Sequence, residues 1–126
     1  SYTGRYKGSD TFGPMGPWLV TKDEIADPHD LEMNCSVAGQ VVAEDSTRYF
    51  NYSVPEVIAY INRFHTLEPG DVIALGTAFK PSKNNKRSIH HSNLAVTGGP
   101  VEISITGLGI LVNSVEYYQE GIMENG

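Results

Sequence analysis

Several kinds of residue are scarce in this chain of 126 residues, and each scarcity excludes a class of protein. A single cysteine, Cys35, has no partner for an internal disulfide, which favours a reducing compartment. No apolar run is long enough to span a bilayer, and the polar N-terminus does not predict a signal peptide. Nine basic against fifteen acidic side chains give a formal net charge of -6, which argues against nucleic-acid binding. We therefore expect one globular domain in the cytoplasm, with neither a membrane nor a nucleic acid as its partner.

Most of the regular structure is predicted to be β. Leu31, Met33, Cys35 and Val37 alternate with polar residues, which is the period-2 pattern of a strand with one buried face. The dipeptide Ala38–Gly39 supplies a turn, so residues 40–43 are predicted to return as the second strand of a hairpin. Three further stretches rich in valine and isoleucine are also predicted to be strands: residues 71–75, 101–106 and 110–115.

One clear helix is predicted after Ser53. Ser53 is a good N-cap, Glu56 completes a capping box, and Pro55 suits the first turn. The apolar residues that follow at helical spacing are Val57, Ile58, Ile61 and Phe64. Thr21 with Glu24 is a second, shorter capping-box candidate. Together these elements predict an α+β domain that is rich in β structure.

A long loop, Thr77–Asn93, follows the stretch 71–75. Loops of this length are uncommon in compact domains and are usually functional or mobile. Four of the nine basic residues lie in it: Lys80, Lys83, Lys86 and Arg87. The loop is either a solvated surface segment or a cationic rim that attracts an anionic substrate or an acidic partner.

The stretch from Lys7 to Trp18 is rich in glycine and proline, and it is neither periodic nor apolar enough to be explained by packing. A loop with such a fixed backbone, between a lysine and an aromatic residue, is typical of one wall of a site. The simpler alternatives are an exposed Lys7, an Asp10 that fixes the loop by accepting backbone N–H bonds, and a Trp18 that only anchors packing.

The pattern Lys-x-x-Asp-Thr-Phe-x-Pro-x-Gly-Pro-Trp over residues 7–18 resembles the fumarylacetoacetate hydrolase superfamily. The later Leu-Glu-Pro-Gly-Asp-Val-Ile-x-x-Gly-Thr over residues 67–77 and the Gly-Leu-Gly at 107–109 resemble the same family in the same order. The resemblance extends over roughly residues 5–115.

This resemblance implies a mixed β-roll and an enzyme that acts on a 2-oxo acid or dicarbonyl-like substrate. The reaction would be C–C bond hydrolysis, decarboxylation, isomerisation or hydration, through an enolate stabilised by Mg²⁺ or Mn²⁺. It further implies that Lys7 is catalytic and either donates to the developing negative charge or orients the leaving fragment. Gly76 and Thr77 would bind the carboxylate of a small-molecule substrate, and Pro17 would close the pocket wall.

The family's metal ligands are a Glu-x-Glu pair and an aspartate, and they precede the lysine that corresponds to Lys7. No metal ligand is therefore predicted within residues 1–126, which would form a single partial domain with a flexible tail at 116–126. We expect a second chain to carry the three carboxylates in a hetero-oligomer, either as a separate subunit or as the other part of a cleaved precursor.

Two histidine-containing segments are the nearest candidates for a metal site within the chain. The segment 29–32 (His-Asp-Leu-Glu) is predicted to be a solvated turn, and His90 and His91 would point to opposite sides of an extended backbone. Neither is expected to bind a metal. The alternatives to an enzyme subunit are a non-catalytic scaffolding subunit and a module that binds a small molecule.

Overall fold

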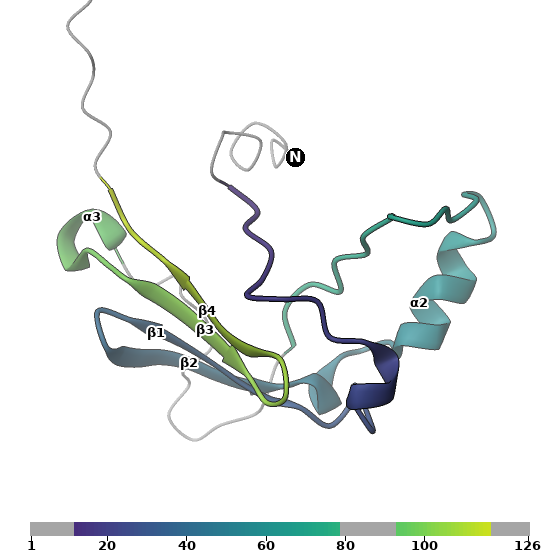
Figure 1. Cartoon of the computed structure of the whole chain (residues 1–126), viewed down its shortest axis with the longest axis horizontal. Helices are drawn as coiled ribbons and strands as arrows, with labels where there is room; N and C mark the ends of the chain where they lie inside the picture. Colours follow the sequence, from purple (N-terminus) through teal and green to yellow (C-terminus); the bar gives the residue numbers. More distant parts are fainter. Residues whose placement is uncertain (1–11, 79–92, 117–126) are drawn as a thin grey trace, which may run out of the picture.

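A computed structural model describes residues 12–78 and 93–116 of the chain. In order, the elements are η1 (Lys22–Glu24), β1 (Glu32–Val37), β2 (Gln40–Ser46), η2 (Thr47–Tyr49), α2 (Val54–Ile61), α3 (Leu94–Thr97), β3 (Val101–Ile105) and β4 (Gly109–Asn113). Figure 1 shows a twisted sheet with α2 held away from it and the N-terminal segment crossing in front of it. The strand order is β2-β1-β3-β4, and every pair is antiparallel.

The sheet consists of two hairpins joined through β1 and β3. Ala38 and Gly39, with φ of 50° and 77°, form the two-residue turn of the first hairpin, since both positions need a positive φ. Between the hairpins, the Ser36 hydroxyl donates a 3.0 Å hydrogen bond to Glu102 Oε2 on the neighbouring strand. The predicted hairpin is confirmed, although its second strand extends to Ser46 rather than to residue 43. The strands predicted at 101–106 and 110–115 are also confirmed and are observed at Val101–Ile105 and Gly109–Asn113.

One face of the sheet is apolar. Cys35, Ile103 and Leu111 lie opposite one another in a single cross-strand row, and Met33, Ile105 and Gly109 form the next row. Few side chains are fully buried: within the described ranges, only Val37 and Ala78 are both apolar and buried. The apolar face therefore depends for its cover on the N-terminal segment rather than on a second layer of helices.

Helix α2 begins as predicted. The Ser53 hydroxyl accepts from the Glu56 N–H, and the Glu56 carboxylate accepts from the Ser53 N–H at 2.7 Å, so the capping box is complete. The Ser53 hydroxyl also donates a 2.7 Å hydrogen bond to the Glu56 carboxylate, and this bond, together with the one from the Ser53 N–H, lowers the pKa of Glu56. The helix ends at Ile61, before Phe64, whose ring instead meets Tyr60 edge to face at 5.3 Å. No residue of α2 is fully buried.

Two predictions differ from the structure, and two short elements are additional to them. Thr21 makes no side-chain cap, and the turn after it is the single 3₁₀ turn η1 rather than a capped helix. Residues 71–75 are not a strand, because they have no partner strand within the part of the chain that the structure describes. The short elements η2 and α3 were not predicted.

Some predictions fall partly or wholly outside the described residues. Only the ends of the long loop 77–93 are described, and the tail that was expected to be flexible is described only at Glu116. The described strands form antiparallel pairs, so the mixed β-roll as a whole stays a prediction. Among the helices described, none is long and apolar enough to cross a membrane.

Candidate functional site

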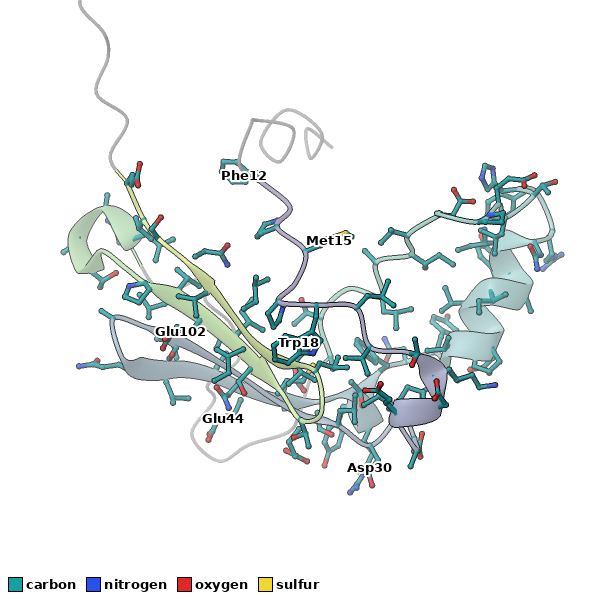
Figure 2. All side chains as sticks on the ribbon, in the orientation of Figure 1. Phe12, Met15, Trp18, Asp30, Glu44 and Glu102 are labelled. Carbon is teal, nitrogen blue, oxygen red and sulfur yellow. The ribbon has the colours of Figure 1, made fainter. Side chains whose placement is uncertain are left out.

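The N-terminal segment lies against the hairpin of β3 and β4. The Gly16–Pro17 peptide bond is cis, and Pro17 and Trp18 contact the backbone of Gly109. A Cβ on Gly109 would come within 2.8 Å of Trp18 Cζ2 and 3.1 Å of Pro17 Cγ. Figure 2 shows Trp18 over the end of this hairpin, with Met15 and Phe12 farther along the segment. A glycine at position 109 is therefore what allows the segment to approach so closely.

A hollow of about 280 Å³ lies between this segment and the apolar face of the sheet. The residues around it are glycine, proline or apolar: Gly16, Pro17, Trp18, Val20, Ile103, Ile105, Leu108, Gly109 and Leu111. None of the described lining residues is charged, so this part of the lining can hold the hydrocarbon part of a small molecule but supplies no acid, base or metal ligand. Pro17 thus lies in the wall of a hollow.

Cys35 lies on the same apolar face, in the row of Ile103 and Leu111. Partial burial raises the pKa of its thiol above the ordinary value of 9.0. The thiol is therefore neutral near pH 7 and behaves as a small apolar side chain rather than as a nucleophile.

Gly76 and Thr77 follow the irregular segment 71–75 and directly precede the buried Ala78. Gly76 has a φ of 80°, and both residues are exposed. Neither belongs to the described lining of the hollow at Pro17. The structure therefore does not join these two predicted parts of the site.

The predicted catalytic residue, Lys7, lies outside the described residues, as do Asp10, the basic residues 80–87 and the pair His90–His91. The predicted roles of these residues rest on the sequence alone.

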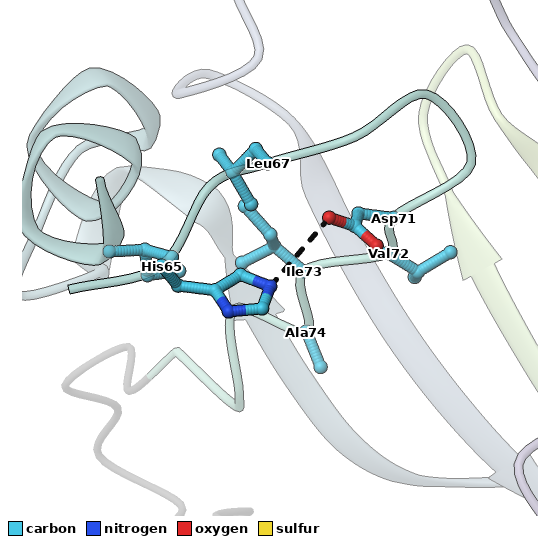
Figure 3. A pocket seen from close by; sticks show the side chains of 7 residues that line it. His65, Leu67, Asp71, Val72, Ile73 and Ala74 are labelled. Carbon is cyan, nitrogen blue, oxygen red and sulfur yellow. Dashed lines mark ion pairs between the residues drawn. The ribbon is translucent and has the colours of Figure 1, made fainter.

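A second hollow, of about 360 Å³, lies where the chain leaves α2, and the sequence analysis did not predict it. Figure 3 shows His65 and Asp71 facing each other across it, with 4.0 Å between Nε2 and Oδ2. Asp71 Oδ2 also accepts a 2.9 Å hydrogen bond from the Glu68 N–H, which closes the turn at Pro69–Gly70. The only sign in the sequence was the Leu-Glu-Pro-Gly-Asp turn itself. At 4.0 Å the His65–Asp71 pair is too long for a hydrogen bond, so the bond from the Glu68 N–H is the one that holds Asp71 in this turn.

The segment 29–32 has structural contacts. His29 Nε2 accepts a 2.9 Å hydrogen bond from the Val54 N–H, and its Nδ1 lies 3.3 Å from Asp27 Oδ1. Asp30 pairs with Arg48, and that carboxylate raises the pKa of the guanidinium. His29 therefore ties the turn before β1 to the start of α2. Across residues 12–78 and 93–116, no three histidine, cysteine or acidic side chains are grouped so that they could hold a metal ion.

Comparison with known proteins gives a consistent picture. The family described as "Fumarylacetoacetate (FAA) hydrolase C-terminal" matches residues 2–116. The chain is 38% identical over 109 residues to "Oxaloacetate tautomerase Fahd2a, mitochondrial" of Rattus norvegicus, covering 86% of this chain and 34% of the relative. It is 37% identical over 111 residues to the "4-hydroxyphenylacetate degradation bifunctional isomerase/decarboxylase" of Salmonella dublin, covering 88% and 23%.

A crystal structure of maleylpyruvate hydrolase from Sphingobium sp. SYK-6 superimposes with a TM-score of 0.68 at 32% identity. The matched region covers 85% of this chain and 36% of that hydrolase. The chain thus spans about a third of the length of such relatives.

Proposed function

Because this chain belongs to the fumarylacetoacetate hydrolase family, we propose that it forms part of a divalent-metal-dependent enzyme acting on a 2-oxo acid or a dicarbonyl-like substrate. The observation that carries this proposal is the family match over residues 2–116, nearly the whole chain. The match spans only a part of each relative, so the activity is proposed for the enzyme to which these residues contribute.

The names of the relatives support the substrate class. One is an oxaloacetate tautomerase, one a maleylpyruvate hydrolase and one a bifunctional isomerase/decarboxylase. Oxaloacetate and maleylpyruvate both carry a carboxylate next to an oxo group. Tautomerisation, decarboxylation and C–C hydrolysis of such compounds all pass through an enolate or a related oxyanion, which one binding site can stabilise. The reaction proposed here is one of this set or a hydration.

Each predicted site residue has a role in the proposal. Lys7 donates to the negative charge that develops on the substrate, and Gly76 and Thr77 bind its carboxylate. The hollow at Pro17 supports the proposal, since its apolar lining suits the carbon chain of a small oxo acid.

The metal, Mg²⁺ or Mn²⁺, would act as a Lewis acid on the substrate oxygens. The described residues do not form a group that fits such an ion. We propose that a second chain supplies a Glu-x-Glu pair and an aspartate, and that the two chains work as a hetero-oligomer in the cytoplasm. Cell fractionation tests this location against the mitochondrial one in the rat relative's name.

The test is turnover of oxaloacetate and maleylpyruvate by the assembled enzyme with and without Lys7→Met. Loss of one donor to a developing oxyanion lowers kcat about 10²- to 10³-fold. Thr77→Val should instead raise KM by about tenfold, as expected for a lost hydrogen bond to a charged group. Lys22→Met, at the exposed lysine of η1, is the matched control and should leave both constants unchanged.

Unchanged turnover in a correctly assembled Lys7→Met enzyme would remove the proposed role of Lys7. An assembled wild-type complex that converts neither substrate, with either metal present, would favour the scaffolding alternative.

A further inference from the structure

The two outer strands of the sheet differ in character. Within the described residues, β4 is hydrogen-bonded to β3 alone, and no described strand pairs with its other side. Its three central residues are apolar on both faces. Leu111 points to the hollow at Pro17, while Ile110 and Val112 lie on the opposite face and are 55% and 54% exposed. A strand that is apolar on both faces is typical of the interior of a sheet rather than of its edge.

Strand β2, the other outer strand, has the usual features of a protected edge. It carries Glu44 and Asp45, and the register of its pairing with β1 is irregular between Cys35 and Ser36. Charged side chains and bulges are common means of preventing a further strand from adding to a sheet. No such feature is present in β4, which has neither a charged residue nor a register shift against β3.

We propose that β4 is the edge to which the second polypeptide of the enzyme adds a strand. The occupant is an extended segment with apolar side chains on both faces, from the part of the enzyme that relatives carry outside the matched third. This inference rests on the proposed function only for the origin of that segment. The added strand lies next to Leu111, so it brings side chains of the second polypeptide to the rim of the hollow at Pro17.

The sheet offers a matched pair of positions for the test. Val41 and Val112 stand at the two ends of one cross-strand row, which runs through Ser36 and Glu102. They are 42% and 54% exposed, one on each outer strand. A lysine at either position places the same charge at the same level of the sheet, on one outer strand or on the other.

The experiment co-expresses the full 126-residue chain with the part of the Sphingobium maleylpyruvate hydrolase outside the aligned stretch. This probe is suitable because the aligned third of that hydrolase has the same fold, with a TM-score of 0.68. The affinity of the purified chain for the probe is then measured, and hydrogen exchange shows which amides of the chain are protected in the complex. We expect wild type and Val41→Lys to bind equally, and Val112→Lys to bind about tenfold more weakly or worse, the effect of losing one buried apolar side chain.

Hydrogen exchange keeps the inference testable even if Val112→Lys does not fold. In the wild-type complex, the amides of β4 should exchange more slowly than in the free chain, and those of β2 should not change. Val112→Thr, which keeps the branched shape, should fold and bind with an intermediate affinity.

Four results would overturn the inference: no association with the probe, protection of β2 instead of β4, weaker binding by Val41→Lys alone, or a homodimer whose β4 amides are protected without the probe. The last result would assign the edge to a second copy of the chain. A complex that follows the expected pattern but has no turnover refutes the proposed function and leaves the pairing edge in place.

Discussion

Replacing Gly109 with alanine tests the contact that holds the N-terminal segment against the sheet. Gly109 has a φ of +91°, where an L-residue costs roughly 1–2 kcal/mol. The new methyl group would also stand 2.8 Å from Trp18 Cζ2 and 3.1 Å from Pro17 Cγ, and such overpacking costs about 1–3 kcal/mol. We therefore expect Gly109→Ala to lower the free energy of unfolding by about 2–5 kcal/mol.

Gly39→Ala is the matched control. Gly39 also has a positive φ, +77°, and lies in the turn of the first hairpin, but no described residue beyond its chain neighbours comes within 4 Å of a Cβ placed there. Gly39→Ala should therefore lower the free energy of unfolding only by the cost of the positive φ, about 1–2 kcal/mol. Urea unfolding of the full chain, followed by far-ultraviolet circular dichroism, measures the difference between the two variants.

The single tryptophan supplies a second measurement. If the segment moves away from the methyl group, Trp18 becomes more accessible and acrylamide quenches its fluorescence more strongly in Gly109→Ala than in Gly39→Ala. Trp18→Ala should also remove most of the extra cost of Gly109→Ala, because the two sites are in contact. Equal destabilisation of the two glycine variants, with unchanged quenching, would refute the packing described here.

Three further predictions concern the helix and the thiol. Ser53→Ala should lower the free energy of unfolding by about 1 kcal/mol, the usual cost of an N-cap, and an unchanged urea midpoint would contradict the capping box. The pKa of Glu56 is lower in the folded chain than its ordinary value of 4.5, so the ionised carboxylate stabilises the fold above pH 4.5. This stabilisation is lost as the pH falls through the lower folded pKa. The urea midpoint should therefore decrease over this pH range, and it should decrease less in Glu56→Gln. Because burial raises the pKa of Cys35, Ellman's reagent at about pH 8 should react more slowly with the folded chain than with the chain in urea, and equal rates would show an open thiol.

Local signals in the sequence predicted the elements that are stabilised locally. The Ser53–Glu56 capping box consists of hydrogen bonds between residues three positions apart, so the sequence pattern names both partners of each bond. The first hairpin was predicted equally well, because Ala38–Gly39 fits a two-residue turn and the flanking residues alternate. Helix α3 carried a usable signal that was missed: Asn93 caps its start, and Gly98, at φ 68°, follows its end.

Features that depend on distant partners could not be predicted. Residues 71–75 have the composition of a strand, but a strand also requires a neighbour for its backbone, which the composition cannot reveal. In the same way, Gly109 was noted only as part of the Gly-Leu-Gly that resembles the family, whereas its proximity to Trp18 joins positions that only the fold brings together. Pro17 lies in the wall of a hollow, but its neighbours there come from β3 and β4 and were not foreseen.

The order of the strands has a consequence for synthesis of the chain. Each hairpin is local, but the central pair joins β1 to β3, with Val37 opposite Val101. The first hairpin therefore leaves the ribosome well before β3 exists, and until then the edge of β1 that pairs with β3 has no partner. Each doubling of the segment between β1 and β3 adds only about 0.6 kcal/mol of closure entropy, so the long separation slows folding more than it lowers stability. A nascent chain paused between residues 50 and 100 should accordingly be the form most prone to aggregate or to bind a chaperone.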